Sequence, residues 1–154
     1  MSYHLIRKVR VSVVAEGKPY RLEGQEGLLE KPSQVVALLK KWCPNDDKEH
    51  FFTILVDARH SPLGINVVSV GTLTASLVHP REVFRPAVVL GAAACLIAHN
   101  HPSGHVGPSP EDRSTTKRLK EAGDILGIQI MDHVIFSMAN DSYTSFRENG
   151  WLDS

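Results

Sequence analysis

The chain has 154 residues, of which 42% are hydrophobic and 22% are charged, as is typical of a soluble globular protein of one domain. Lysine and arginine together number 17, and so do aspartate and glutamate, so the overall charge gives no argument for a nucleic-acid partner. No signal peptide opens the sequence, the longest apolar run (88–98) is too short to cross a bilayer, and two cysteines cannot form a disulfide framework. We therefore expect a cytoplasmic protein without membrane association.

The first half of the chain alternates strand-like and helix-like segments. Residues 3–22 alternate around a Glu-Gly-Lys-Pro turn and predict a β-hairpin. Ser33 is then a suitable N-cap for a helix with one apolar face, formed by Val35, Val36, Leu38, Leu39 and Trp42. Aromatic and branched residues predict a strand over 51–56 and a second over 65–70.

The second half continues this alternation. A helix is expected from Pro80 to near Gly91, followed by a strand buried on both faces over 94–98, in which Cys95 is a small buried hydrophobe. A long helix should run over 109–126, with strands over 128–136 and 143–146 after it. The residues expected to face the core from the two helices are Val83, Phe84, Ala87, Val88, Leu119, Ala122 and Leu126. Gly127 is expected to end the long helix. This order predicts an α/β sandwich with a mixed sheet.

The segment 99–112 carries the chemistry. Because side-chain direction repeats every two residues along a strand, His99 and His101 point the same way and can both reach one zinc ion at about 2.0–2.1 Å. Asp112, in the first turn of the following helix, can return as an oxygen ligand. Two histidines and a carboxylate leave a fourth position open for water, which is the pattern of a catalytic zinc site.

A structural interpretation of the same residues exists. A His-x-His pair alone is a weak signal of metal binding. Ser109 is a good N-cap, Pro110 suits the first helical position, and Asp112 can bond back to the cap and favour the helix dipole. That interpretation leaves the two histidines and the Pro-Ser-Gly turn after them unexplained.

The motif His99-Asn100-His101-Pro102-Ser103-Gly104, with Ser109 and Asp112 at these offsets, resembles the JAMM (MPN-type) metalloprotease motif H-x-H-P-x6-S-x2-D. Further segments resemble the RadC branch of that superfamily: 71–73, 78–84, 122–123, 126–128 and 132–135. The resemblance implies a JAMM/MPN-like (cytidine-deaminase-like) three-layer sandwich with a mixed sheet between helices. Full-length RadC proteins carry an N-terminal helix-hairpin-helix region. We expect instead one stand-alone RadC-like domain over 1–154, with a hairpin-like extension (1–32) and a core (33–150).

The resemblance also implies roles for the residues that match. His99, His101 and Asp112 fall on the ligands of one zinc ion per chain, and Ser109 falls on the serine that hydrogen-bonds the tetrahedral intermediate. Glu49 occupies the place of the general base that activates the metal-bound water, although without the resemblance it reads equally well as a solvated residue of an acidic turn. The implied function is a zinc-dependent hydrolase, a peptidase or isopeptidase (a metalloprotease) acting on a peptide or protein substrate.

Several alternatives stay open at this stage. Glu82 is the rival for the general base, but it reads as part of the first turn of a structural helix. His105 reads as an exposed loop residue, with a substrate contact or an extra ligand as the alternatives. His133, beside Asp132, could support the ligands, but it reads as a core histidine bonded to backbone, so neither histidine joins the ligand set. The basic helix residues Arg113, Lys117, Arg118 and Lys120 read as a solvated face. A DNA-associated RadC-like protein (in repair or mobile elements) and a non-catalytic interaction module are the competing functions. Nucleic acid is unsupported by composition, and neither the substrate nor the oligomeric state can be read from the sequence.

Overall fold

The computed structural model describes residues 8, 10–16, 29–71 and 78–153. The helices and strands of this part are α1 (Pro32–Lys40), β1 (Glu49–Val56), β2 (Pro62–Gly71), α2 (Pro80–Leu90), β3 (Ala94–Asn100), α3 (Pro110–Leu126), β4 (Gln129–Phe136) and β5 (Tyr143–Ser145). The strands form one sheet in the order β2-β1-β3-β4-β5. Neighbours β3 and β4 are parallel and the other neighbours are antiparallel, so the predicted mixed sheet is confirmed.

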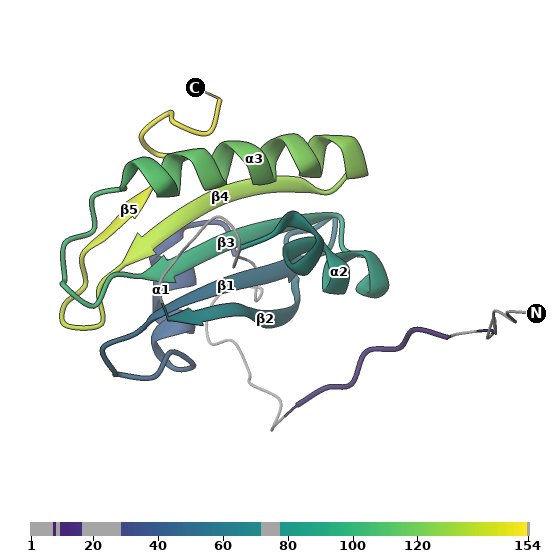
Figure 1. Ribbon diagram of the computed structural model, residues 1–154, viewed down its shortest axis with the longest axis horizontal. Helices are drawn as coiled ribbons and strands as arrows, with labels where there is room; N and C mark the ends of the chain where they lie inside the picture. Colours follow the sequence, from purple (N-terminus) through teal and green to yellow (C-terminus); the bar gives the residue numbers. More distant parts are fainter. Residues whose placement is uncertain (1–7, 9, 17–28, 72–77, 154) are drawn as a thin grey trace, which may run out of the picture.

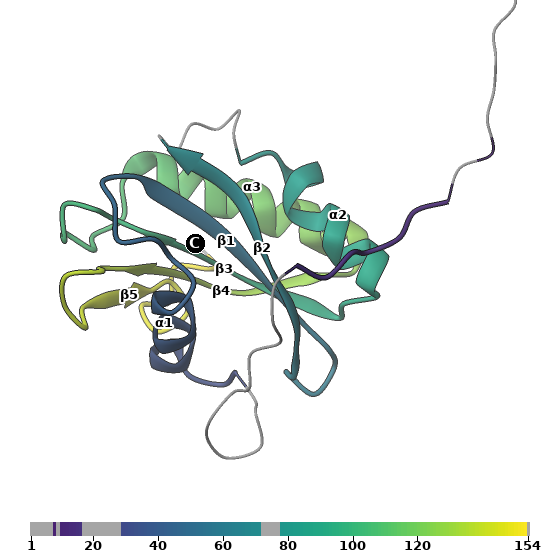
Figure 2. The same ribbon diagram turned by 90° about the horizontal axis from the view of Figure 1, so that it is seen from below.

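Helices cover both faces of the sheet, with α1 on one face and α2 and α3 on the other (Figures 1 and 2). Alternate residues of β1 divide between the two layers: Phe52, Ile54 and Val56 pack with α1, whereas Phe51 and Leu55 pack with α2 and α3. Burial on both faces explains why β1 and β3 read as continuous apolar runs. The predicted three-layer α/β sandwich, consistent with a JAMM/MPN-like fold, is therefore confirmed.

The predictions for residues 3–33 are not confirmed by the described part of the chain. Most of the predicted hairpin (3–22) lies outside the described residues, and residues 10–16 form no strand. The first helix is capped by Lys31 and not by Ser33, because Pro32 takes the first helical position, where a missing N–H costs nothing. Leu29 is buried with α1, ahead of the predicted start of the core at residue 33.

Three residues expected in the core are exposed. Trp42 follows the end of α1 and is 43% exposed, because the helix stops at Lys40. Val88 is 58% exposed, since α2 buries the stripe formed by Val83, Phe84 and Ala87, which Val88 does not share. Leu126, in the last turn of α3, is 50% exposed.

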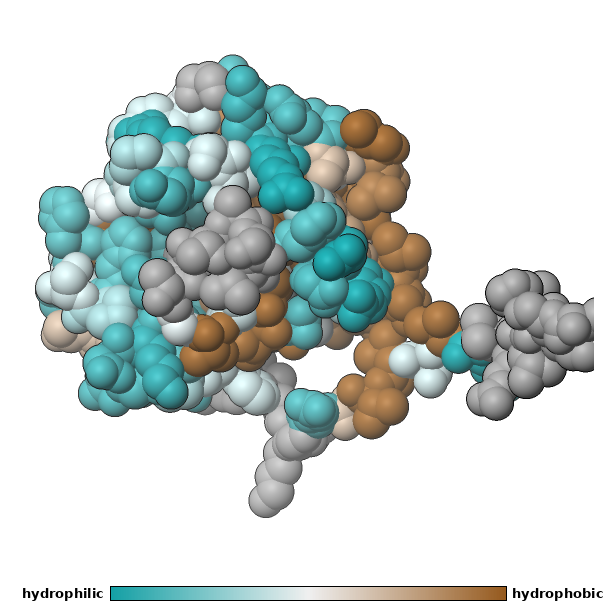
Figure 3. Space-filling model, in the orientation of Figure 1, coloured by the Kyte–Doolittle hydropathy of each residue, from teal (hydrophilic) through white to brown (hydrophobic). Residues whose placement is uncertain are grey.

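Exposed apolar side chains gather on one side of the molecule, over the C-terminal ends of α2 and α3 and over residues 10–16 (Figure 3). They include Val11, Val13, Val14, Val88, Ile125 and Leu126. The C-terminal end of β3 and the start of α3 lie at the opposite end of the sheet (Figure 1). The polar motif (99–112) and this apolar surface are thus separated by the length of α3 (Figure 1).

No helix in the described part of the chain combines the length and the hydrophobicity needed to span a membrane.

Candidate metal centre

Two elements bring the predicted metal ligands together. His99 lies in β3, His101 directly follows that strand, and Asp112 lies in the first turn of α3. Their potential ligand atoms all lie within 4.8 Å of one another. The Nε2 atoms of the two histidines are 2.9 Å apart, and the Asp112 oxygens lie 3.2 Å from the Nε2 of His99 and 3.5 Å from that of His101. Both imidazoles therefore face the same point as the carboxylate.

Asp112 serves the helix and this cluster at the same time. Its backbone N–H donates to the Ser109 hydroxyl (3.0 Å), and its Oδ2 accepts from the Ser109 N–H (2.7 Å). This is the capping box that the sequence suggested. The structural interpretation and the ligand interpretation are thus compatible, because the cap fixes the carboxylate in the place where it meets the imidazoles.

The ring of His101 is oriented by the chain after it. Its Nδ1 lies 2.7 Å from the carbonyl oxygen of His105, and since a carbonyl only accepts, this nitrogen carries the proton. In the neutral imidazole the Nε2 is then an unprotonated acceptor that faces the Asp112 carboxylate. Acceptors converging on one point require a cation or a proton between them. Two imidazoles and a carboxylate form a donor set that suits zinc.

The pKa values of the cluster favour a cation. Burial raises the pKa of Asp112, but hydrogen bonds with His101 and His99 outweigh burial and hold that pKa well below its usual range. Burial also lowers the pKa of both imidazoles. It prevails at the fully buried His99, whereas at His101 the Asp112 carboxylate and the His105 carbonyl prevail and raise the pKa. The ionised Asp112 thus supplies the negative charge that a metal ion needs.

Glu49 begins β1 beside this cluster. The antiparallel pairing of β1 with β3 ends at Phe51 and His99, two residues along the chain from Glu49 and His101 respectively. Burial acts to lower the pKa of both His99 and His101, and the charge of the Glu49 carboxylate is one of the effects that oppose burial at both imidazoles. Glu49 is half-buried, and its carboxylate and the imidazoles therefore share one end of the sheet.

Asn100 holds the backbone on both sides of Glu49. Its side-chain Oδ1 accepts from the His50 N–H (2.7 Å), and its Nδ2 donates to the Lys48 carbonyl (3.0 Å). Asn100 is fully buried and sits between the two histidines of the motif. Because side chains alternate along a strand, the side chain of Asn100 points opposite to those of its neighbours His99 and His101. This alternation is a sequence signal from which a separate structural role for Asn100 could have been predicted.

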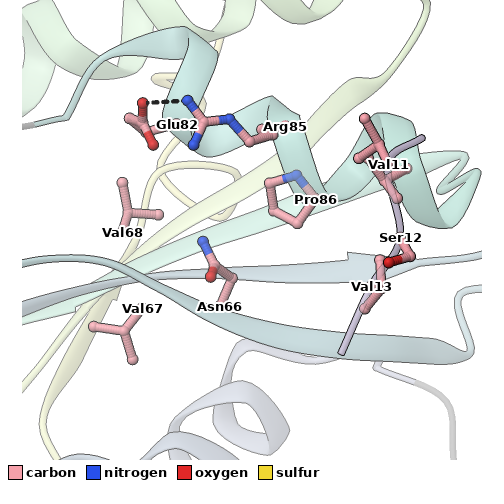
Figure 4. A pocket seen from close by; sticks show the side chains of 10 residues that line it. Val11, Ser12, Val13, Asn66, Val67, Val68, Glu82, Arg85 and Pro86 are labelled. Atoms are coloured by element: carbon pink, nitrogen blue, oxygen red, sulfur yellow. Dashed lines mark hydrogen bonds and ion pairs between the residues drawn. The ribbon is translucent and has the colours of Figure 1, made fainter. Parts of the chain in front are cut away.

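The rival base, Glu82, has other partners. It forms ion pairs with Arg85 (2.8 Å) and Arg81 (3.7 Å) and lines a pocket between α2 and β2 (Figure 4). Residues 11–13 also line that pocket, and neither His99 nor His101 does. Glu82 therefore belongs to the first turn of a structural helix, as the sequence indicated.

His133 departs from its prediction as a core histidine bonded to backbone. Both of its ring nitrogens meet side chains: Nε2 lies 2.9 Å from Nδ1 of His99, and Nδ1 lies 2.6 Å from the Thr116 hydroxyl. Burial holds the pKa of His133 well below its usual range, so the ring is neutral. Sequence reasoning missed this link because the two histidines are 34 residues apart and on different strands.

Arg113 and Lys120, in the basic run of α3, contact other residues of the chain. The guanidinium of Arg113 lies 4.3 Å above the ring of Trp151, and Lys120 forms ion pairs with Asp124 and Asp153. Arg113 and Lys120 thus have contacts within the chain, in addition to the solvated face that the sequence predicted for this run. The side chain of His105 is exposed, as expected, and only its carbonyl contributes to the cluster.

Comparison with known proteins gives evidence about the family of this chain that does not depend on the geometry of the site. Residues 29–151 match the family model described as RadC-like JAB domain. A UPF0758 protein of Rubrobacter xylanophilus is 46% identical over 125 residues, which are 81% of this chain and 54% of that protein. Those of Symbiobacterium thermophilum and Caldanaerobacter subterraneus are 51% and 40% identical over 104 and 131 residues, covering 68% and 85% of this chain and 44% and 55% of theirs. The chain thus spans about half the length of the curated relatives it matches.

Proposed function

The chain belongs to the family of RadC-like JAB domains, and from this membership we propose that it is a zinc-dependent hydrolase of peptide or isopeptide bonds. The JAB/MPN superfamily includes metallohydrolases. The observation that carries the proposal is the convergence of His99, His101 and Asp112 beside a half-buried glutamate. A non-catalytic module has no need of such a constellation.

Each residue of the cluster has a task in this proposal. His99, His101 and Asp112 would hold one zinc ion, which when bound would supply a Lewis acid and lower the pKa of a water molecule to about 7. Glu49 takes the proton of the attacking water and passes it to the leaving nitrogen. The Ser109 hydroxyl uses a lone pair for the Asp112 N–H, so its own proton can be donated to the oxyanion of the substrate.

The substrate in this proposal is a peptide or protein. The cytoplasmic location expected from the sequence is part of the same proposal. The competing DNA-associated function finds less support, because Arg113 and Lys120 already contact Trp151 and carboxylates of this chain.

Metal analysis is the first test. Purified protein should contain about one zinc per chain, or take it up after chelation, because three ligands and one open position suit that ion. His99→Ala, His101→Ala and Asp112→Asn should abolish this binding. A wild-type protein that holds no metal and takes up no zinc would contradict the proposal.

The second test separates the base from the ligands. A proteome-derived peptide library is incubated with the zinc-loaded protein, and new termini are mapped to find a cleaved sequence. Glu49→Gln should keep zinc and lose at least about 10²-fold in turnover, the low end of what general acid–base catalysis contributes. Glu82→Gln is the matched control and should cleave like wild type. Full turnover in Glu49→Gln would remove Glu49 from this role, and loss of zinc there would make it a ligand.

Ser109 requires a variant pair, because it caps α3 as well. Ser109→Ala should lose roughly 10²–10³ in rate, as when an oxyanion donor is removed. It should also lose about 1 kcal/mol of folding free energy through the missing cap. Ser109→Thr retains the hydroxyl and should retain most of both properties. Equal turnover in Ser109→Ala and wild type would exclude the oxyanion role.

A further inference from the structure

A chain of hydrogen bonds runs from the back of His99 to the start of α3. His99 Nδ1 lies 2.9 Å from Nε2 of His133, and the other nitrogen of His133 lies 2.6 Å from the Thr116 hydroxyl. That hydroxyl lies 2.6 Å from the backbone carbonyl oxygen of Asp112. His99 and His133 are fully buried and Thr116 is 2% exposed, so these groups satisfy one another rather than water.

The carbonyl at the end of the chain assigns every proton in it. A carbonyl oxygen only accepts, so the Thr116 hydroxyl gives its single proton to Asp112. The Thr116 oxygen must then accept from His133 Nδ1–H. A neutral imidazole has one N–H, and therefore the His133 Nε2 is an acceptor that receives the proton of His99 Nδ1–H.

The proton positions determine which nitrogen of His99 has a free lone pair at the cluster of ligands. With its proton on Nδ1, the neutral His99 has a lone pair on Nε2, the atom that faces His101 and Asp112. The other tautomer would point an N–H at the metal position. The other end of this chain of hydrogen bonds is the backbone carbonyl of Asp112. The ligands His99 and Asp112 are therefore connected through His133 and Thr116, which do not face the metal position.

Aromatic rings hold His133 in this orientation. Phe146 stacks on it with ring centroids 4.8 Å apart, and Phe51 meets its edge at 5.7 Å. Phe51 also stacks on His99. Both phenylalanines are buried, which leaves the two imidazoles no water to bond with in place of each other.

We infer that Thr116 and His133 are positioning residues that fix His99 in its Nδ1–H tautomer and so prepare its Nε2 for a metal ion. The tautomer is a property of the metal-free chain, and its consequence for zinc rests on the proposed function. Ligating histidines commonly donate their other N–H to a partner, and loss of such a partner costs about 10- to 100-fold in metal affinity.

Nuclear magnetic resonance of the metal-free protein tests the proton positions directly. Two-bond ¹⁵N–¹H correlation spectra of histidine-labelled wild type should show His99 and His133 both protonated on Nδ1. In Thr116→Val, which keeps the shape and removes the hydroxyl, His133 should lose this preference. A proton on Nε2 of His133 in wild type would overturn the inference.

Zinc affinity tests the consequence. The metal-free proteins are titrated with zinc against a chromophoric chelator. Thr116→Val should bind zinc about 10- to 100-fold more weakly than wild type, at an unchanged stoichiometry. Thr116→Ser restores the hydroxyl and should restore the affinity, which a purely structural role of the methyl group would not predict. His133→Leu should bind at least as weakly as Thr116→Val.

The outcomes are distinguishable from failure of the proposed function. Wild-type affinity in Thr116→Val would overturn the role of the chain of hydrogen bonds while zinc binding stands. A wild type that takes up no zinc would instead contradict the proposed function. The spectra of the metal-free protein would in that case still decide the tautomer.

Discussion

At the scale of single residues, Asn100 links the metal cluster to Glu49. Its amide is the partner of one backbone N–H and one backbone carbonyl, on the two residues that flank Glu49. Both groups lie at the start of β1, before Phe51 in the sequence, where β1 and β3 are no longer paired. A fully buried side chain thus substitutes for the strand hydrogen bonds that the sheet does not supply there.

Asn100→Ala should therefore destabilise the fold and loosen Glu49. Removing the amide leaves both the His50 N–H and the Lys48 carbonyl without this partner, and the buried His50 N–H costs about 1–3 kcal/mol when unsatisfied. Urea denaturation of the metal-free protein measures this loss, with the exposed Asn45→Ala as control. If both variants unfold at the wild-type urea concentration, Asn100 does not hold the strand.

At the scale of elements, α3 approaches the sheet closely at Gly123. A Cβ on this residue would lie 2.5 Å from the backbone oxygen of Ile128 and 3.2 Å from the ring of Phe84. The Ile128 N–H in turn donates to the Gly123 carbonyl (3.0 Å). The close contact sets how α3 turns into β4, and with it the distance of Asp112 and Thr116 from His133.

Gly123→Ala should destabilise the protein, although alanine ordinarily favours a helix interior by up to about 1 kcal/mol over glycine. The added methyl meets backbone, which moves only with the helix, and overpacking of this kind costs about 1–3 kcal/mol. Gly64→Ala is the matched control, because its Cβ would meet Leu90 at an ordinary 3.6 Å. Chemical denaturation measures the free energy of unfolding of both variants. A Gly123→Ala variant more stable than wild type would show that α3 can shift without cost.

At the scale of the whole molecule, the two hydrophobic layers do not depend on the metal cluster. One layer joins α1 to residues such as Phe52, Ile54 and Phe136, and the other joins α2 and α3 to residues such as Leu55 and Ile97. β3 ends and α3 begins at one end of the sheet (Figure 1), and His99, His101 and Asp112 belong to these element ends but to neither hydrophobic cluster. The fold should accordingly form without zinc.

Chelation should therefore lower the unfolding temperature without unfolding the protein at 25 °C. At free zinc 1,000 times the Kd, binding adds about 4 kcal/mol of stability, which a chelator removes. Far-UV circular dichroism at 25 °C should keep its helix signal in the chelator, and a thermal scan should show the lower midpoint. Loss of that signal at 25 °C would make the metal part of the fold.

The sequence alone determined the local features, because each rests on neighbours along the chain. The two-residue period of a strand turns His99 and His101 the same way, and their Nε2 atoms do meet. The Ser-Pro-Glu-Asp run predicted the capping box, and Gly127 ends α3 in the left-handed conformation, with φ 71°. Helix and strand order likewise followed from periodicity.

Only the tertiary structure decided which distant residues complete the cluster. His133 reaches His99 across 34 residues, and Asn100 reaches His50 across 50, because β3 lies between a parallel and an antiparallel neighbour. Strand order and register are absent from the periodicity of any one strand. A strand buried on both faces is a continuous apolar run, and its sequence does not indicate which residues face which helix layer. The partners of His99 and Glu49 are therefore decided only by the assembled sheet.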